Sequence, residues 1–151
     1  MHIDPMIGGI TIVAPTLSNT PQSSLVLLVE DDTHICRLLC KILVEQQGFT
    51  VITSEQPEIA LRFLQSHCED VACVLTEIRF TKQPSIEGVK LVRRFKTVFP
   101  TIPVVALVGM TDHGVIKSLN RLDVRTIKKP FQIANVLTAL QHAVALSRTV
   151  H

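Results

Sequence analysis

Short, mostly apolar runs alternate with amphipathic segments from residue 25 onwards, and this alternation constrains the fold more than any other feature of the chain. The first run is Leu25–Val29, and the others lie at residues 49–53, 71–76, 103–108 and 124–127. Runs of this kind are typical of strands that are buried on both faces of a parallel sheet. Because helical segments separate them, the sequence predicts an α/β fold.

The segments between the runs repeat apolar residues every three or four positions, which is the spacing of a helix with one buried face. The predicted helices cover residues 33–47, a segment that begins at Pro57, residues 88–99, residues 115–121 and a last segment that begins near Phe131. We expect their inward stripes to include Leu38 in the first helix, Val98 in the third and Ile133 in the last.

Right-handed crossovers between parallel strands leave few ways to assemble these elements. We predict a doubly wound, five-stranded parallel sheet with strand order 2-1-3-4-5 and helices on both faces. In such a sheet, ligands bind at the carboxyl ends of the strands, beside the switch point between the first and third strands. The residues that end the strands are therefore the candidates for function.

The length and composition of the chain fit one domain. At 151 residues the chain is too short for two ordinary domains, and its 46% apolar content is sufficient for a core. We assign residues 24–148 to this domain and residues 149–151 to a tail. Residues 1–23 are rich in Gly, Pro, Ser and Thr, and we expect a flexible arm or linker with a short extended piece at Ile10–Ala14.

Composition excludes several classes of function. The net charge of +2 is too close to zero for an electrostatic nucleic-acid binder. No apolar run approaches the ~20 residues that span a bilayer. The chain has no Tyr and no Trp, so it has no phenol or indole with which to stack on a base or sugar. We expect a cytoplasmic protein with reduced thiols, in which Cys36 and Cys40 pack as small apolar residues rather than form a redox or metal pair.

Acidic and basic residues gather where the predicted strands end. Glu30 and Asp31 follow the first strand, Glu77 ends the third, and Lys129 ends the fifth. Carboxylate oxygens are the ligands that Mg²⁺ prefers, and a lysine at the same edge can hold a phosphoryl group as a point charge. Asp32, which follows the acidic pair, is predicted to cap the first helix.

Five segments of the chain, in order and at similar spacings, resemble the receiver domain of response regulators, the CheY-like module of two-component signalling. These segments are Val26–Asp32, Leu75–Arg79, Pro84–Gly88, Ile102–Leu107 and Lys129–Phe131. The resemblance covers residues 25–146, and it implies a flavodoxin/CheY-like three-layer sandwich.

In this family an aspartate that ends the third strand accepts a phosphoryl group from a histidine kinase, and an acidic pair after the first strand binds Mg²⁺. The resemblance places Glu77 at the acceptor position and Glu30 and Asp31 at the acidic pair, so these three residues are the candidate magnesium ligands. It places Lys129 and Val108 at the positions that contact the phosphoryl group. The sequence leaves open whether this chain binds Mg²⁺.

Three positions depart from the family pattern. Glu77 replaces the acceptor aspartate and carries its carboxylate one methylene further out, where an acyl phosphate would miss the in-line geometry that phosphoryl transfer requires. Val108 replaces a Thr or Ser and has no side-chain donor. Thr126 stands at the switch position, where the family has an aromatic ring that turns inward. The loop after Glu77 is also longer than usual, through residues 80–83.

These departures favour a pseudo-receiver, in which ordinary aspartate phosphorylation is lost and the domain acts by protein–protein contact. The alternative is a working receiver that takes a phosphoryl group from a histidine kinase with the help of Mg²⁺. We do not expect an enzyme, and Arg79 stands where an acid-phosphatase-type site needs a second acid.

The expected partners are a histidine kinase or another signalling protein. Receivers commonly dimerise or bind partners through the face formed by the fourth helix, the fifth strand and the fifth helix, and basic residues on this face are candidates for an interface or a homodimer. These candidates are Lys117, Arg121, Arg125 and Lys128. We expect no direct binding to nucleic acid or to membranes.

Overall fold

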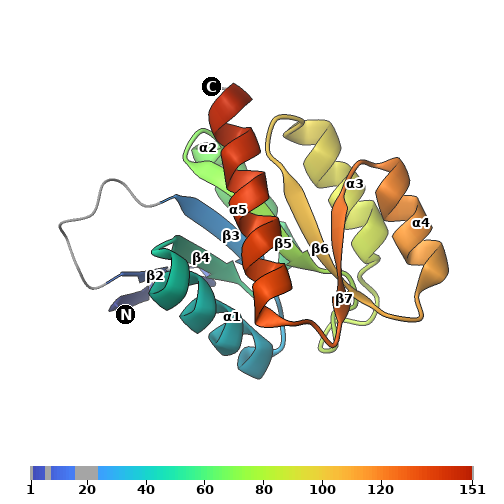
Figure 1. Ribbon diagram of the computed structural model, residues 1–151, viewed down its shortest axis with the longest axis horizontal. Helices are drawn as coiled ribbons and strands as arrows, with labels where there is room; N and C mark the ends of the chain where they lie inside the picture. The colour runs from blue at the N-terminus through green and yellow to red at the C-terminus, as the bar shows by residue number, and fades with distance from the viewer. Residues whose placement is uncertain (1, 6–7, 16–23, 151) are drawn as a thin grey trace.

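The computed structural model describes residues 2–5, 8–15 and 24–150, which form seven strands and five helices (Figure 1). The strands are β1 (His2–Pro5), β2 (Ile10–Ala14), β3 (Leu25–Val29), β4 (Thr50–Ser54), β5 (Val71–Glu77), β6 (Val104–Gly109) and β7 (Arg125–Lys129). The helices are α1 (Thr33–Gln47), α2 (Pro57–His67), α3 (Gly88–Val98), α4 (His113–Arg121) and α5 (Ile133–Val150). The chain is therefore an α/β protein, as its sequence predicts.

The strands form one sheet in the order β1-β2-β4-β3-β5-β6-β7. The five strands from β3 to β7 pair in parallel. Taken alone, they follow the order second, first, third, fourth, fifth, so the predicted doubly wound topology is confirmed. The switch point of this sheet lies between β3 and β5, because the strands that follow these two in sequence continue to opposite sides.

At the start of the chain the structure confirms the predicted extended piece, which is β2 with the same bounds, Ile10–Ala14. It differs from the predicted arm or linker because this piece belongs to the sheet. β2 pairs antiparallel with β4, and β1 pairs antiparallel with β2. Ile10 and Val13 of β2 are only 6% and 4% exposed, and they enter the two cores on opposite faces of the sheet. A five-residue apolar run in a Gly- and Pro-rich background indicates an extended segment, but it does not show that the segment joins the sheet. The rest of the expected arm, residues 16–23, lies outside the described residues.

Two hydrophobic cores lie on the two faces of the sheet and give the molecule three layers. One core joins the sheet to α2, α3 and α4, and the other joins it to α1 and α5. Alternate residues of β3 enter alternate cores, since Leu27 and Val29 face the first, whereas Val26 and Leu28 face the second. This alternation is the two-residue period of a strand that is covered on both faces.

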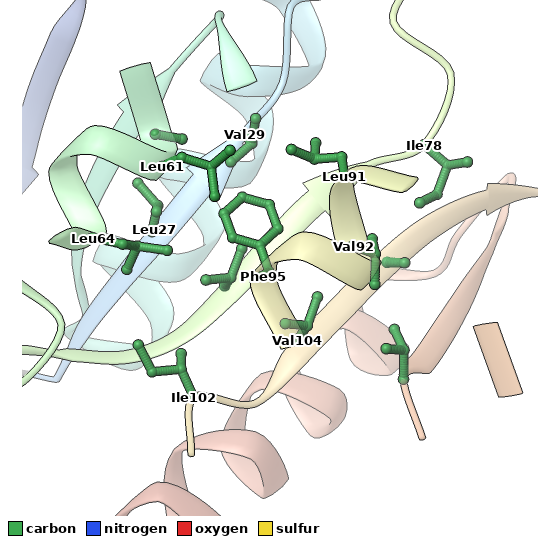
Figure 2. Close-up of a cluster of buried hydrophobic side chains, with 14 of the residues drawn as sticks. Leu27, Val29, Leu61, Leu64, Ile78, Leu91, Val92, Phe95, Ile102 and Val104 are labelled. Carbon is green, nitrogen blue, oxygen red and sulfur yellow. The ribbon is translucent and has the colours of Figure 1, made fainter. Parts of the chain in front are cut away.

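Phe95 lies at the centre of the first core, between the side chains of α2, α3 and the sheet (Figure 2). The buried stripes of the helices are narrower than the sequence predicts. Leu38, Val98 and Ile133 were expected to point inward, but they are 47%, 55% and 43% exposed. Leu38 lies at the margin of the apolar stripe of α1, and a helix that packs on a sheet buries the centre of that stripe first. Val98 is the last residue of α3 and Ile133 is the first residue of α5, so both lie at helix ends.

α5 extends to Val150, so residues 149–150 continue the helix past the expected domain end at residue 148. His151, the last residue of the expected tail, lies outside the described residues. Among the helices that the structure describes, none is both long and apolar enough to cross a lipid bilayer.

Candidate functional site

The acidic and basic residues at the strand ends meet at one edge of the sheet. Glu30 and Asp31 follow β3, Glu77 is the last residue of β5, and Lys129 is the last residue of β7. The three acidic residues are buried, with exposures of 1%, 0% and 2% in chain order, whereas the Lys129 side chain is 31% exposed. The parallel register brings these residues together, because parallel strands end at the same edge.

The Glu77 carboxylate is held by three donors. Its Oε1 accepts hydrogen bonds from the backbone N–H groups of Ile78 and Arg79, at 2.9 and 3.0 Å. Its Oε2 forms an ion pair with the Nζ of Lys129. The extra methylene of glutamate allows the side chain to fold back onto its own backbone while it still reaches the lysine. Both oxygens are thus engaged at the position where the family carries its phospho-acceptor.

Asp31 faces the loop between β5 and α3 instead of facing Lys129. Its Oδ2 accepts the N–H of Lys82 at 2.7 Å, and its Oδ1 accepts the N–H of Thr81 at 3.2 Å. Both donors lie in the segment that makes this loop longer than usual. The additional residues therefore supply backbone partners for a buried carboxylate that would otherwise need a cation.

Glu30 is the least satisfied member of the site. Its Oε1 accepts the N–H of Asp32 at 3.0 Å, but its buried Oε2 has no hydrogen-bond partner among the described residues. Burial raises the pKa of the Glu30 carboxyl to about 8, and the neighbouring Glu77 carboxylate adds to the rise. Glu30 therefore keeps its proton at neutral pH, since the charged form has lost its water.

The arrangement does not fit a magnesium ion held by all three carboxylates. Over the part of the chain that the structure describes, no group of three or more His, Cys, Asp or Glu is placed to hold a metal. Asp31 directs both oxygens at loop N–H groups, and Glu77 is engaged by Lys129, so only Glu30 keeps a free oxygen. Magnesium binding here stays a prediction from the family resemblance.

Two further positions of the predicted site lack the side chains that the family pattern has there, a hydroxyl donor and an aromatic ring. Val108, near the end of β6, is 1% exposed and offers no side-chain donor. Thr126 of β7 is half-buried and lines a hollow of about 470 Å³ at the outer edge of the sheet, together with Met110 and Lys128. The small Thr126 side chain places no ring in this hollow.

An ion pair that sequence analysis missed joins the loops after β5 and β6. The Arg79 guanidinium donates its Nε–H and Nη2–H to the two carboxylate oxygens of Asp112, at 2.8 and 2.7 Å. These hydrogen bonds hold the pKa of Asp112 below its usual range. The only signal in the sequence is that both residues follow strand ends, which does not reveal that they face each other.

The predicted cap of the first helix is confirmed. The Asp32 side chain accepts the N–H groups of His34 and Ile35, at 2.9 and 3.1 Å. These hydrogen bonds lower the pKa of Asp32 and give it a role that is separate from the neighbouring acidic pair.

The candidate interface residues lie on α4 and β7, which are adjacent elements (Figure 1). β7 is the last strand of the sheet. Lys117 and Arg121 lie on α4, Arg125 and Lys128 lie on β7, and all four are exposed. The structure thus places these residues on two adjacent elements at the β7 edge of the sheet. Because Arg125 and Lys128 lie three residues apart on a strand, their side chains point to opposite faces of the sheet.

Gly88, the first residue of α3, fixes how closely this helix approaches the site loop. A Cβ at Gly88 would lie 2.2 Å from the carbonyl oxygen of Ile78, the residue after Glu77. Gly88→Ala is therefore expected to lower the free energy of unfolding by about 1–3 kcal/mol, because backbone must move. Urea unfolding measures the effect. Gly114→Ala in α4 is the matched control, since nothing lies within 4 Å of its Cβ; equal effects at the two sites would contradict the prediction.

The matching sequence family agrees with this geometry. Residues 26–141 match the response regulator receiver domain. The chain belongs to this family. Receiver domains work with sensor histidine kinases and other signalling proteins, and they are generally signalling modules rather than enzymes.

Two curated relatives contain a segment that is similar to this chain. The autoinducer 1 sensor kinase/phosphatase LuxN of Vibrio campbellii is 28% identical over 130 residues, which is 86% of this chain and 14% of LuxN. The DNA-binding transcriptional regulator NtrC of Proteus hauseri is 26% identical over 124 residues, which is 82% of this chain and 25% of NtrC. This receiver domain therefore spans a quarter or less of the length of these two relatives.

Solved structures show the same fold. The signal receiver domain of an HD domain-containing protein from Pseudomonas fluorescens Pf-5 superposes with a TM-score of 0.73 at 22% identity, over 89% of this chain and 96% of that one. A response regulator receiver domain protein from Clostridium thermocellum also gives 0.73, over 85% of this chain. The CheY-like architecture of this receiver is thus shown.

Proposed function

We propose that this receiver domain is a pseudo-receiver, which takes part in two-component signalling by protein–protein contact and is not switched by ordinary aspartate phosphorylation. It has no enzymatic activity of its own. Its partner is a histidine kinase or another signalling protein. All four cysteines are free thiols, which agrees with action in the reducing cytoplasm.

The engagement of Glu77 is the observation that carries this proposal. An acceptor carboxylate must present an oxygen in line with the incoming phosphorus. Here one oxygen accepts two backbone N–H groups, and the other is paired with Lys129. Attack by Glu77 on a phosphodonor would break these contacts. The glutamate side chain, which is longer than that of aspartate, would also have to reach the in-line position.

The surroundings of Glu77 favour the same conclusion. A phosphoryl group at this position would meet Val108, which has no donor to offer its oxygens. Thr126 would have no ring to move in response. The altered acceptor, contact and switch positions lie on one route from phosphorylation to output, and this favours loss of the route as a whole.

Incubation with a small phosphodonor and Mg²⁺, followed by intact-mass measurement, tests the proposal. The expected result is no gain of a phosphoryl group by the wild-type chain. A phosphoryl group mapped to Glu77 would overturn the proposal and favour the working receiver. The triple variant Glu77→Asp, Val108→Thr, Thr126→Tyr is the positive control, and it is expected to recover Mg²⁺-dependent phosphorylation.

Charge reversal on α4 and β7 tests the contact face. The double variant Arg121→Glu, Arg125→Glu is expected to weaken self-association or binding to a partner kinase by about tenfold. The introduced glutamates would repel the acidic groups of a partner surface that the arginines attract. Sedimentation and titration binding assays measure this change. The double variant Arg62→Glu, Arg93→Glu carries the same charge change on exposed positions of α2 and α3. If both pairs behave like the wild type, the face has no role in contact.

A further inference from the structure

A cavity lies between β2, the amino-terminal half of α1 and the end of β4. Its volume is about 500 Å³, which is within the range of small-molecule sites. Thr11 on β2 and Thr53 on β4 line it, and the α1 side of the wall carries Cys36, Arg37 and Cys40. The antiparallel strand β2 closes this cavity, so the site exists because residues 10–14 join the sheet.

Two thiols open into this cavity from one helix face. Cys36 is half-buried and Cys40 is 5% exposed, and they lie four residues apart in α1. The Cys40 thiol is hydrogen-bonded to Cys36 and lowers the pKa of the Cys36 thiol, whereas the pKa of Cys40 is raised by this bond and by burial. The pair thus consists of one accessible sulfur and one buried donor. Cys40 packs in the core as the sequence predicts, but the Cys36 side chain also lines the cavity.

The groups that face Cys36 come from three elements. On α1, Arg37 favours the thiolate; on β4, the Thr53 hydroxyl donates a hydrogen bond that also favours it. Glu55, which follows β4, opposes it by charge repulsion. The residues of β2 that line the cavity carry no ionisable side chain. Thiolates rather than thiols are the nucleophiles in disulfide exchange, so this surrounding makes Cys36 the reactive member of the pair.

The other two cysteines provide an internal comparison. Cys68 is half-buried like Cys36, but it lies at the end of α2 and packs against the first core. Cys73 lies in β5 and is fully buried, and burial raises the pKa of its thiol to about 12. Of the two half-buried thiols, Cys36 is the one that lines this cavity and has a thiol donor in Cys40.

We propose that Cys36 is a site of reversible thiol modification, at which its thiolate attacks a low-molecular-weight disulfide bound in this cavity. The Cys36 sulfur forms a new S–S bond as the S–S bond of the disulfide breaks. The leaving sulfur departs with the electron pair and takes a proton from water. Cys36 is oxidised to the disulfide level, and half of the incoming disulfide is reduced to a thiol. A free thiol reverses the reaction by the same exchange.

Cys40 acts as a positioning residue and does not complete a second exchange. Side chains four residues apart on a helix hold their Cβ atoms about 5–6 Å apart. A disulfide needs Cβ atoms about 3.5–4.5 Å apart. An intrahelical Cys36–Cys40 disulfide therefore requires distortion of α1, and the adduct on Cys36 persists until an external thiol removes it.

Arg37 indicates the kind of disulfide that suits the site. Arg37 lines the cavity together with Glu55, so the cavity offers a guanidinium for a carboxylate and a carboxylate for an ammonium group. An anionic peptide-like disulfide, which carries both carboxylate and ammonium groups, therefore fits better than a purely cationic one. Glutathione disulfide serves as the anionic probe, and cystamine serves as the cationic comparison.

The test is peptide mapping of the reduced full-length protein after exposure to glutathione disulfide near pH 7. The expected product is a single mixed disulfide on Cys36, formed about tenfold faster than on Cys68. Cys36→Ser is expected to abolish the fast reaction, and the matched variant Cys68→Ser is expected to keep it. Equal rates at Cys36 and Cys68, or faster reaction with cystamine than with glutathione disulfide, would overturn the proposal.

A pH profile separates a positioning role of Cys40 from simple packing. Cys40→Ala removes the donor and is expected to shift the midpoint of the Cys36 rate profile to higher pH and to slow the reaction several-fold at pH 7. Cys40→Ser retains a hydroxyl donor and is expected to keep the wild-type midpoint. Identical profiles for the alanine and serine variants would show that Cys40 only packs. A two-hydrogen loss in mass, with a Cys36–Cys40 disulfide, would contradict the persistent adduct.

Discussion

At pH 8.5, replacement of Glu30 by glutamine is expected to raise the free energy of unfolding by about 2–4 kcal/mol. The wild-type side chain must then carry a charge in a buried position, where its Oε2 has no hydrogen-bond partner among the described residues. Glutamine keeps the shape of the side chain and carries no charge. The gain follows from the raised pKa of Glu30, about 8 in the folded protein against an ordinary value of 4.5.

The sign of the pH dependence follows from the same difference in pKa. Between pH 4.5 and pH 8 the folded chain keeps the Glu30 proton, whereas the unfolded chain has lost it. The contribution of Glu30 to stability is therefore fully present below pH 4.5 and is lost as the pH rises through about 8. Below pH 4.5, Glu30→Gln and the wild type should have nearly equal stability.

Urea unfolding from pH 4 to pH 9 in the presence of a chelator measures this difference. Glu45→Gln is the matched control, because Glu45 is an exposed residue of α1. The free energy of unfolding of this variant is expected to follow that of the wild type across the pH range. Parallel curves for the wild type and Glu30→Gln would show that Glu30 is ionised throughout, and that its buried oxygen is compensated in another way.

Phe95→Ala is expected to lower the free energy of unfolding by about 3–5 kcal/mol. Phe95 is 1% exposed and touches side chains from both helices and strands, so its loss leaves a cavity between α2, α3 and the sheet (Figure 2). A domain of this size has a total stability of about 5–15 kcal/mol, and the variant should therefore be close to unfolded at 37 °C.

Val98→Ala provides the control for Phe95→Ala on the same helix. Val98 is 55% exposed, and its truncation is expected to cost less than about 0.5 kcal/mol. Thermal and urea unfolding followed by circular dichroism suit both variants, since the chain has no Trp. A cost at Val98 that matches the cost at Phe95 would mean that α3 packs in a different rotation.

The central sheet could be predicted because its strands carry a strong local signal. Leu25–Val29 is wholly apolar, and such a run requires cover on both faces wherever it lies. The extended piece at Ile10–Ala14 could also be predicted, but its place in the sheet could not, because that place depends on the free edge of β4 rather than on the composition of β2. The predictions of which side chains point inward were wrong at the ends and margins of helices for a related reason. The position of Val98 fits the apolar stripe of α3, but the distance between helix and sheet decides which side chains are covered.

The candidate site likewise has a part that the sequence predicts and a part that it does not predict. The contact between Glu77 and Lys129 follows from strand order alone, because both residues end parallel strands. The hydrogen bonds from Thr81 and Lys82 to Asp31 depend on the path of an irregular loop, which no periodicity describes. The cavity beside Cys36 depends on the pairing of β2 with β4, so it could not be predicted from the sequence for the same reason as that pairing.

The edge strands have a consequence for how the protein behaves at high concentration. A chain shortened to residue 26, where the family match begins, would lack β1 and β2. β4 would then present an open row of backbone N–H and C=O groups, and such an edge is a template for aggregation. In the intact chain this edge is formed instead by β1, a strand of four residues that ends in Pro5, and a short edge strand with proline is a poorer template for pairing. The opening segment therefore lowers the tendency of the sheet to assemble edge to edge, whether or not the domain is signalling.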